Sequence, residues 1–298
     1  MSFDYILSQF VNGIKLGSIY AVVAIGYSMV YGILKLINFA HGDLMTVGVY
    51  TMLVLMGFSG IPIWLVILVG CGMSIIFGMT MEKLVYRPLR GSGEETTLIA
   101  SLAVSVFLQN LISMIFSPQK RAFHLPDFLT QTYRLGSITL SVMNILTFIS
   151  IVIILIALTL MLKKTKIGMA MRACSDNLAA SQLMGIKINT VVAAAFVIGS
   201  GLAGLTGLML AGEYKTIEPL MGFVPGLKAF CAAVLGGIGS LNGAVLGGFI
   251  IGIAEMLFAG LMPTDITPYR DAFIFLLLIV VLLVKPNGIL GSSEGGRS

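Results

Sequence analysis

Most of this chain consists of apolar runs long enough to cross a lipid bilayer as helices. A spanning helix needs about 20 predominantly apolar residues. Runs of about this kind lie at 17–36, 61–81, 96–117, 139–162, 190–212, 241–262 and 271–285. Only 10% of the residues are charged, against about 25% in soluble domains, so a soluble fold could not bury this apolar surface. The sequence predicts an all-α integral membrane protein in which residues 1–298 form one polytopic helix bundle.

Two shorter apolar runs, 44–59 and 227–239, leave the number of crossings open between eight and nine. Each has glycine close by, and each is either a short transmembrane segment or a re-entrant half-helix. Residues 2–14 have an amphipathic pattern, which favours a helix lying in the membrane interface over a span. We therefore expect about eight or nine transmembrane segments, some of them discontinuous or re-entrant.

A polar, basic segment at 163–189 interrupts the apolar pattern. Its basic residues are Lys163, Lys164, Lys166, Arg172 and Lys187. Cytoplasmic loops of membrane proteins carry an excess of Lys and Arg, so we expect this segment to be cytoplasmic. Nine crossings then place the N-terminus outside and the C-terminus in the cytoplasm. The loop 118–138, with Lys120, Arg121 and Arg134, lies outside as an exception that a longer loop tolerates.

The chain lacks the common catalytic and metal-binding motifs. It has no G-x-x-x-x-G-K-[ST] phosphate loop and no H-E-x-x-H zinc helix. A G-x-S-x-G match at 291–295 lacks the strand and helix that a nucleophile elbow requires. Cys71, Cys174 and Cys231 are too widely spaced to indicate a disulfide framework or a metal site. The net charge of +5 has no clustered basic stripe, which argues against nucleic-acid binding. We expect no catalytic residue, no metal site and no enzymatic activity.

Glycine is abundant, with 35 residues, and it gathers in apolar segments such as 199–212 and 236–252. Such small residues let transmembrane helices pack closely. Glycine breaks can also line a transport pathway with backbone groups, and the two roles are compatible. A short internal similarity also favours a transporter. His41–Leu44 and Ile238–Leu241 each place Gly and a potential N-cap before a glycine-containing run, as in transporters built from repeats. The match is short enough for chance to produce it.

Few charged or titratable residues lie inside the apolar segments, and each has two interpretations. Glu255 has no basic residue within a helical turn, so it either pairs across helices as a structural contact or lines the pathway. Asp43 could hold a substrate ammonium, but N-capping of the following helix is the favoured role. His41, beside Asn38, is expected to be a satisfied structural group. No chain of intramembrane acids and histidines indicates a proton-coupled pump.

Three separated motifs resemble one known family. They are INFAHGDLMTVGVY (Ile37–Tyr50), MRACSDNLAASQLMGI (Met171–Ile186) and AAVLGGIGSLNGAVLGG (Ala232–Gly248). In this order, over about residues 5–290, they resemble the branched-chain amino acid permeases of ATP-binding-cassette (ABC) importers, and most closely the H-type permease subunit. The resemblance implies a permease in the bacterial inner membrane that translocates branched-chain amino acids.

The resemblance also implies partners. Such a permease pairs with a second, homologous permease subunit and with two cytoplasmic ATP-binding subunits. Those subunits use the ATP and Mg²⁺, so this chain needs no cofactor of its own. A periplasmic or lipid-anchored binding protein delivers the substrate. The coupling helix would be Met171–Leu183, ended by Gly185, and would carry Arg172, Asp176, Ala179 and Ala180 to the ATP-binding subunits.

The substrate pathway is expected at two candidate helix openings. Helix N-termini suit a carboxylate, and carbonyls or a carboxylate suit an ammonium. The residues are Asn38, His41, Gly42 and Asp43 at the first opening, Gly239, Ser240 and Asn242 at the second, and Glu255. Two alternatives remain at this stage. One is a urea or short-amide permease of the same family, and the other is an ion-coupled secondary transporter, which would leave the coupling segment without a purpose. The sequence leaves open which substrate is preferred. It also leaves open whether the two permease subunits form a heterodimer or a homodimer.

Overall fold

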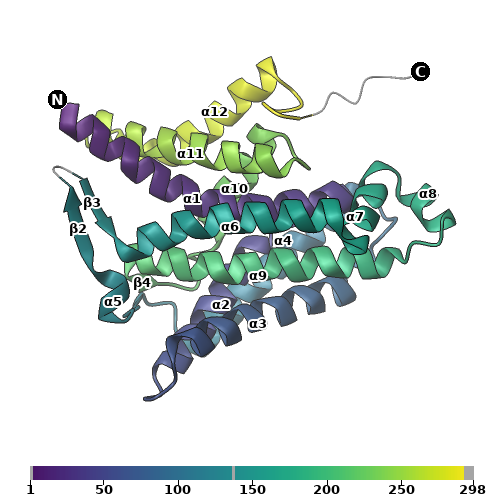
Figure 1. The fold of residues 1–298 in the computed structure, drawn as a ribbon, viewed down its shortest axis with the longest axis horizontal. Coiled ribbons are helices and arrows are strands. Elements are labelled where there is room, and N and C mark those ends of the chain that lie inside the picture. Colours follow the sequence, from purple (N-terminus) through teal and green to yellow (C-terminus); the bar gives the residue numbers. More distant parts are fainter. Residues whose placement is uncertain (1–2, 136–137, 292–298) are drawn as a thin grey trace.

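A computed structural model describes residues 3–135 and 138–291, and its long helices run along the longest axis of the molecule (Figure 1). The G-x-S-x-G match at 291–295 lies almost entirely outside the described residues. The helical elements are α1 (Phe3–Leu34), α2 (His41–Met56), α3 (Ile63–Met81), the π-helical turn η1 (Glu82–Tyr86), α4 (Glu94–Phe116), α5 (Asp127–Thr130), α6 (Val142–Lys164), α7 (Lys166–Asp176), α8 (Leu178–Leu183), α9 (Ile188–Tyr214), α10 (Phe223–Gly236), α11 (Leu241–Leu261), the 3₁₀ turn η2 (Thr267–Tyr269) and α12 (Arg270–Val284).

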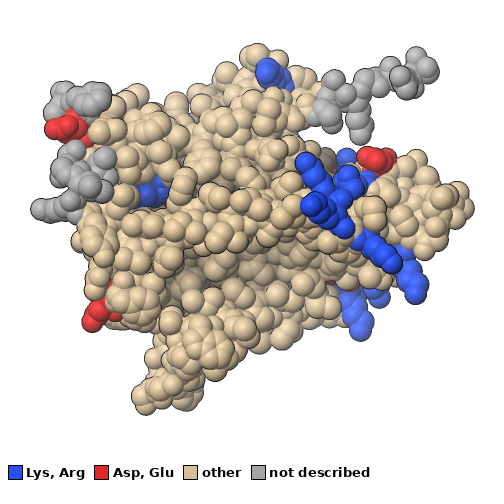
Figure 2. Space-filling view, in the orientation of Figure 1, with Lys and Arg blue, Asp and Glu red and all other residues tan. Residues whose placement is uncertain are grey.

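Four short strands form two small antiparallel pairs. Strand β1 (Arg121–Ala122) pairs with β4 (Thr216–Ile217), and β2 (Thr132–Leu135) pairs with β3 (Ile138–Ser141). Together with α5 they lie at one end of the bundle, which we call the hairpin end. Helices α7 and α8 lie at the opposite end, the α7–α8 end (Figure 1). Lys and Arg side chains gather at the α7–α8 end on the face shown in Figure 2.

Within the described residues, seven helices are long and apolar enough to cross a membrane, which confirms the predicted all-α polytopic class. Helices α2 and α10 have 16 and 14 residues and so measure roughly 24 and 21 Å at about 1.5 Å per residue. The hydrocarbon core of a bilayer is about 30 Å thick. Neither short helix is therefore long enough to cross it alone.

Helix α1 lies at the centre of the bundle and is a single helix of 32 residues. The expected separate interfacial helix at 2–14 is therefore wrong, because this segment continues into the span. The cause is close packing of α1 glycines against the backbone of α11. A Cβ on Gly13 would lie 2.6 Å from the Cα of Ile253, and one on Gly17 would lie 2.8 Å from the Cα of Phe249. Glycines thus hold α1 against α11 along its first half, as the small-residue pattern predicts.

Candidate functional site

Helix α2 begins inside the bundle. His41, its first residue, is 2% exposed. Its ring lies against Gly26 of α1 and Gly199 of α9, where added Cβ atoms would approach it to 2.6 and 3.3 Å. Gly26 stands eight residues before the end of α1, which is about 12 Å along the helix axis. The chain therefore turns back after α1 and starts α2 at mid-depth, as expected for a discontinuous helix.

The N-terminus of α10 meets the N-terminus of α2 at this depth. A Cβ on Gly226 would lie 2.7 Å from the Cα of Gly42, so the two backbones touch. The Gly222 N–H donates to Thr46 Oγ1 at 3.1 Å. From this junction α2 runs toward the hairpin end, where Tyr50 contacts Phe116. Helix α10 runs the other way.

Two helix N-termini thus face each other near the middle of the bundle. Each helix N-terminus carries a partial positive charge from its aligned peptide dipoles, and discontinuous helices of this kind hold anionic substrate groups in several transporters. Gly42 is the predicted site residue that forms the contact. Gly222 was missed, although its spacing from Gly226 is the G-x-x-x-G signal of close helix packing.

A small cavity of about 10 Å³ adjoins the junction, which is about the space of one water molecule. Its polar lining includes Tyr27, Tyr31, Asn38 and His41. Both amide atoms of Asn38 and the Nε2 atom of His41 are buried without a hydrogen-bond partner among the described residues. The expectation that His41 is a satisfied structural group is therefore wrong for Nε2. Buried polar atoms are normally paired, so these atoms are available to a ligand or a water.

Asp43 does not cap α2. The helix begins two residues before it, and the N-cap residue is Ala40, which makes no side-chain cap bond. The Asp43 carboxylate instead accepts a hydrogen bond from Gln109 Nε2 of α4 at 3.1 Å. The capping prediction is wrong because the chain already turns at Asn38, whose carbonyl accepts from the His41 N–H.

The second predicted opening is a capping turn packed against α1. The Gly239 N–H donates to Ser28 Oγ at 2.9 Å, and Ser240 Oγ accepts from the Gly243 N–H at 3.1 Å, which caps α11. Asn242 is exposed. The internal similarity therefore does not correspond to the meeting point in the fold, because the counterpart of the α2 N-terminus is Gly222 and not Ser240. Only Ile238 of this turn lines the small cavity.

Glu255 pairs across helices, in a charge cluster that the sequence did not reveal. Its Oε1 lies 2.7 Å from Lys228 Nζ of α10, and its Oε2 accepts from Tyr20 OH of α1 at 2.9 Å. Lys228 Nζ also lies 2.7 Å from Asp271 Oδ1 of α12, and Arg270 Nε lies 3.7 Å from both acids. Lys228 was missed because it stands 27 residues before Glu255. The cluster joins α1, α10, α11 and α12.

The coupling element forms two helices, so the predicted single helix Met171–Leu183 is wrong. The break is at Asn177, whose side chain accepts from the Ala180 N–H at 2.9 Å and caps α8. Gly185 ends the element with a φ of +83°, as predicted. Arg172, Asp176, Ala179 and Ala180 are exposed. The most exposed large apolar side chains of this element are Leu183 and Met184, at 89% and 83%. Leu183 ends the predicted helix, but neither side chain was among the predicted coupling residues.

A polar contact ties the residues after the coupling element to the loop before α4. Arg90 Nη1 donates to Asn189 Oδ1 at 2.6 Å, and Arg90 Nη2 lies 3.1 Å from the buried carboxylate of Glu82. Burial lowers the pKa of the Arg90 guanidinium, and the charge of Glu82 acts in the opposite direction. Because a guanidinium stays charged in proteins, Arg90 links the start of α9 to η1, the turn that follows α3.

Comparisons with known proteins agree with the predicted resemblance. The family described as "Branched-chain amino acid transport system / permease component" matches residues 9–282. The chain is 41% identical to the high-affinity branched-chain amino acid transport system permease protein BraD of Pseudomonas aeruginosa, over 97% of this chain and 96% of the relative. It is 40% identical to the corresponding protein LivH of Escherichia coli, over 98% and 97%. A probable LivH of Methanocaldococcus jannaschii is 30% identical, over 91% and 88%. No solved structure matches the chain.

Proposed function

This chain belongs to the family of branched-chain amino acid transport permeases, and on that basis we propose that it is the membrane-spanning permease subunit of an ABC importer for branched-chain amino acids. The meeting of the α2 and α10 N-termini carries the proposal. An amino acid has a carboxylate that two facing N-termini attract, and the unpaired atoms of Asn38 and His41 supply further polar contacts.

The α7–α8 end is the proposed cytoplasmic face. It carries the basic residues of the coupling element, in keeping with the excess of Lys and Arg on cytoplasmic loops. The hairpin end is then external, with the N-terminus outside the bacterial inner membrane and the C-terminus inside. A binding protein delivers the substrate to the hairpin end.

Energy comes from partner subunits. Two cytoplasmic ATP-binding subunits use ATP and Mg²⁺, and this chain acts as a single permease domain without an enzymatic site. The exposed Leu183 and Met184 at the end of α8 provide an apolar contact, and Arg172 and Asp176 orient it. A second, homologous permease subunit completes the membrane part. Movement of α7 and α8 then changes access to the α2–α10 junction.

Reconstitution of the purified complex into proteoliposomes tests the proposal. With ATP inside and leucine-loaded binding protein outside, we expect ATP-dependent leucine uptake, and we expect the two ATP-binding subunits to co-purify with the permease. The double variant Arg172→Glu, Ala179→Glu should insert normally but lose uptake, because it changes only the exposed coupling surface. Uptake of urea without leucine would overturn the substrate assignment. Transport by the chain alone, driven by an ion gradient, would overturn the ABC assignment.

A further inference from the structure

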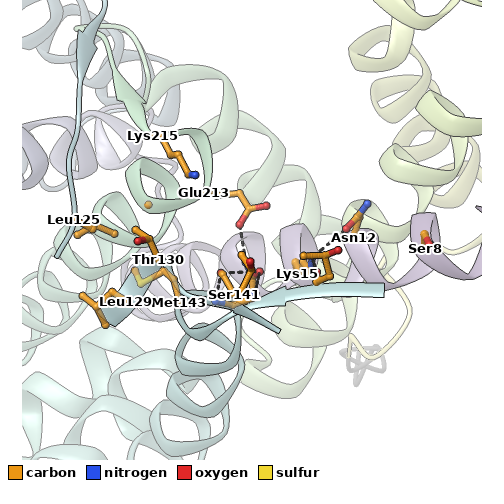
Figure 3. Close-up of a pocket in the computed structure, with 14 residues that line it drawn as sticks. Ser8, Asn12, Lys15, Leu125, Leu129, Thr130, Ser141, Met143, Glu213 and Lys215 are labelled. Carbon is orange, nitrogen blue, oxygen red and sulfur yellow. Dashed lines mark hydrogen bonds between the residues drawn. The ribbon is translucent and has the colours of Figure 1, made fainter. Parts of the chain in front are cut away.

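A polar pocket lies at the hairpin end (Figure 3). None of its lining residues belongs to the α2–α10 junction. Its volume is about 320 Å³, at the lower end of the range of about 300–1,000 Å³ typical of small-molecule sites. Residues from α1, α5, α6, α9 and the β2–β3 hairpin line it. Three stretches of the chain, within 8–15, 125–144 and 212–215, therefore build one pocket.

The pocket holds charges of both signs. The Lys15 ammonium donates to Thr139 O at 2.7 Å and to Asn12 Oδ1 at 3.2 Å. An ammonium has three N–H donors, so one remains for a further acceptor. Glu213 at the end of α9 lies close enough to interact electrostatically with Lys15, and Figure 3 shows its carboxylate directed toward Ser141 with Lys15 beside it.

The position of Glu213 is set by the cap of α6. Ser141 and Asn144 form a capping box, in which each side chain bonds to the backbone N–H of the other. This arrangement orients the Asn144 amide so that its Nδ2 donates to Glu213 Oε2 at 2.6 Å. A carboxylate accepts about four hydrogen bonds, so Glu213 retains the capacity to accept from an ammonium.

Apolar side chains line another part of the same pocket. Leu125, Leu129 and Met143 are each less than 9% exposed and all line it. Gly212 stands opposite them, where an added Cβ would lie 2.9 Å from Leu125 Cδ1 and 3.2 Å from Met143 Cγ. A side chain at 212 would therefore collide with Leu125 unless Leu125 moved, so glycine lets α9 pack closely against this apolar wall.

We propose that this pocket is an outer binding site for α-amino acids with aliphatic side chains. Lys15 binds the α-carboxylate, Glu213 binds the α-ammonium, and Leu125, Leu129 and Met143 contact the side chain. Lys215 also lines the pocket and adds a second positive charge to it. The choice of ligand rests on the proposed function, but the site itself is distinct from the α2–α10 junction. It would hold the substrate after release by the binding protein and before passage inward.

Photolabelling of the complete transporter tests this site. The probe is a photoreactive leucine that carries a diazirine in its side chain. We expect labelling of peptides within 123–145, and we expect leucine to suppress it. Two analogues should suppress the labelling poorly: 3-methylbutylamine lacks the carboxylate, and 4-methylpentanoate lacks the ammonium. Lys15→Gln and Glu213→Gln should each raise the leucine concentration for half-suppression by about tenfold or more, since each removes a charge-assisted hydrogen bond to the ligand.

The competitors separate binding from a merely structural role. In the Lys15→Gln variant, 3-methylbutylamine should compete about as well as leucine. In the Glu213→Gln variant, 4-methylpentanoate should compete about as well as leucine. A structural role would weaken all three competitors alike. Lys120→Gln and Glu218→Gln are the matched controls. They remove the same charges from an exposed pair, 3.4 Å apart, outside the pocket, and should change nothing.

Two results would overturn the outer site. One is labelling confined to other segments, and the other is equal competition by leucine in wild type and in both pocket variants. Leucine uptake by the same proteoliposomes distinguishes this failure from failure of the proposed function. Uptake without pocket labelling rejects only the outer site, whereas absence of uptake by the wild-type complex rejects the transport assignment.

Discussion

Replacing Lys228 by Met should destabilise the protein more than replacing its partner Glu255 by Gln. The two side chains are 4% and 2% exposed, and their charged atoms lie 2.7 Å apart. Loss of Lys228 leaves Glu255 and Asp271 close together, with only Arg270 Nε at 3.7 Å from each. Loss of the Glu255 charge leaves Lys228 paired with Asp271 at 2.7 Å.

The magnitude follows from this geometry. At an effective dielectric constant of about 20, two unit charges 2.7 Å apart attract by about 6 kcal/mol, most of which offsets desolvation. Breaking a buried pair by removing one partner costs about 3–5 kcal/mol. We expect about 3 kcal/mol for Lys228→Met, because Arg270 compensates in part. Glu255→Gln should cost about 1–2 kcal/mol, since a glutamine can still accept from Tyr20.

The assay is unfolding of the purified permease complex by titration with SDS in mixed micelles, followed by circular dichroism. The double variant Lys228→Met, Glu255→Gln should recover part of the loss, because it leaves no unpaired charge from this pair. Two results would refute the buried-pair argument. One is a loss of unfolding free energy below about 1 kcal/mol for Lys228→Met. The other is a loss in the double variant that equals the sum of the two single losses. A large fall in leucine uptake in Glu255→Gln at normal stability would instead assign Glu255 to the pathway.

Three further changes test other parts of the structure. Gly42→Val should prevent the contact with Gly226 and abolish uptake. The complex should also aggregate at a lower temperature, because overpacking typically costs about 1–3 kcal/mol. Normal uptake would contradict the assignment of the α2–α10 junction to the pathway. Leu183→Asp should reduce co-purification of the ATP-binding subunits while leaving insertion unchanged, and full recovery of these subunits would exclude α8 as the contact. Gly185→Ala should cost about 1 kcal/mol, because its φ of +83° disfavours a side chain; an unchanged SDS midpoint would contradict this.

The class of the protein could be predicted because its signals are local. Apolar runs, the basic segment at 163–189 and glycine spacing each lie within a short stretch of chain. The two short helices were also identified, because their runs are shorter than the bilayer requires. The family resemblance could be predicted for the same reason, because its three motifs are continuous segments. The family match over residues 9–282 confirms it.

Local signals misled where a neighbouring element decided the outcome. Asp43 follows a turn and resembles an N-cap, but α2 begins earlier and Gln109 of α4 provides its partner. The coupling segment has a helical pattern throughout, yet the Asn177 side chain bonds to the backbone and starts a second helix. Asn is prone to such local bonds, so this break had a signal in the sequence.

The sequence by itself therefore determined that the chain enters a membrane, how many long spans it has and which end is basic. Tertiary structure alone decided which residues meet. Gly42 and Gly222, Lys228 and Glu255, and Lys15 and Glu213 are each separated by many residues along the chain. Hydropathy records only how strongly each segment prefers lipid. The contacts among segments depend on close packing and charge pairing between helices, which one segment cannot specify.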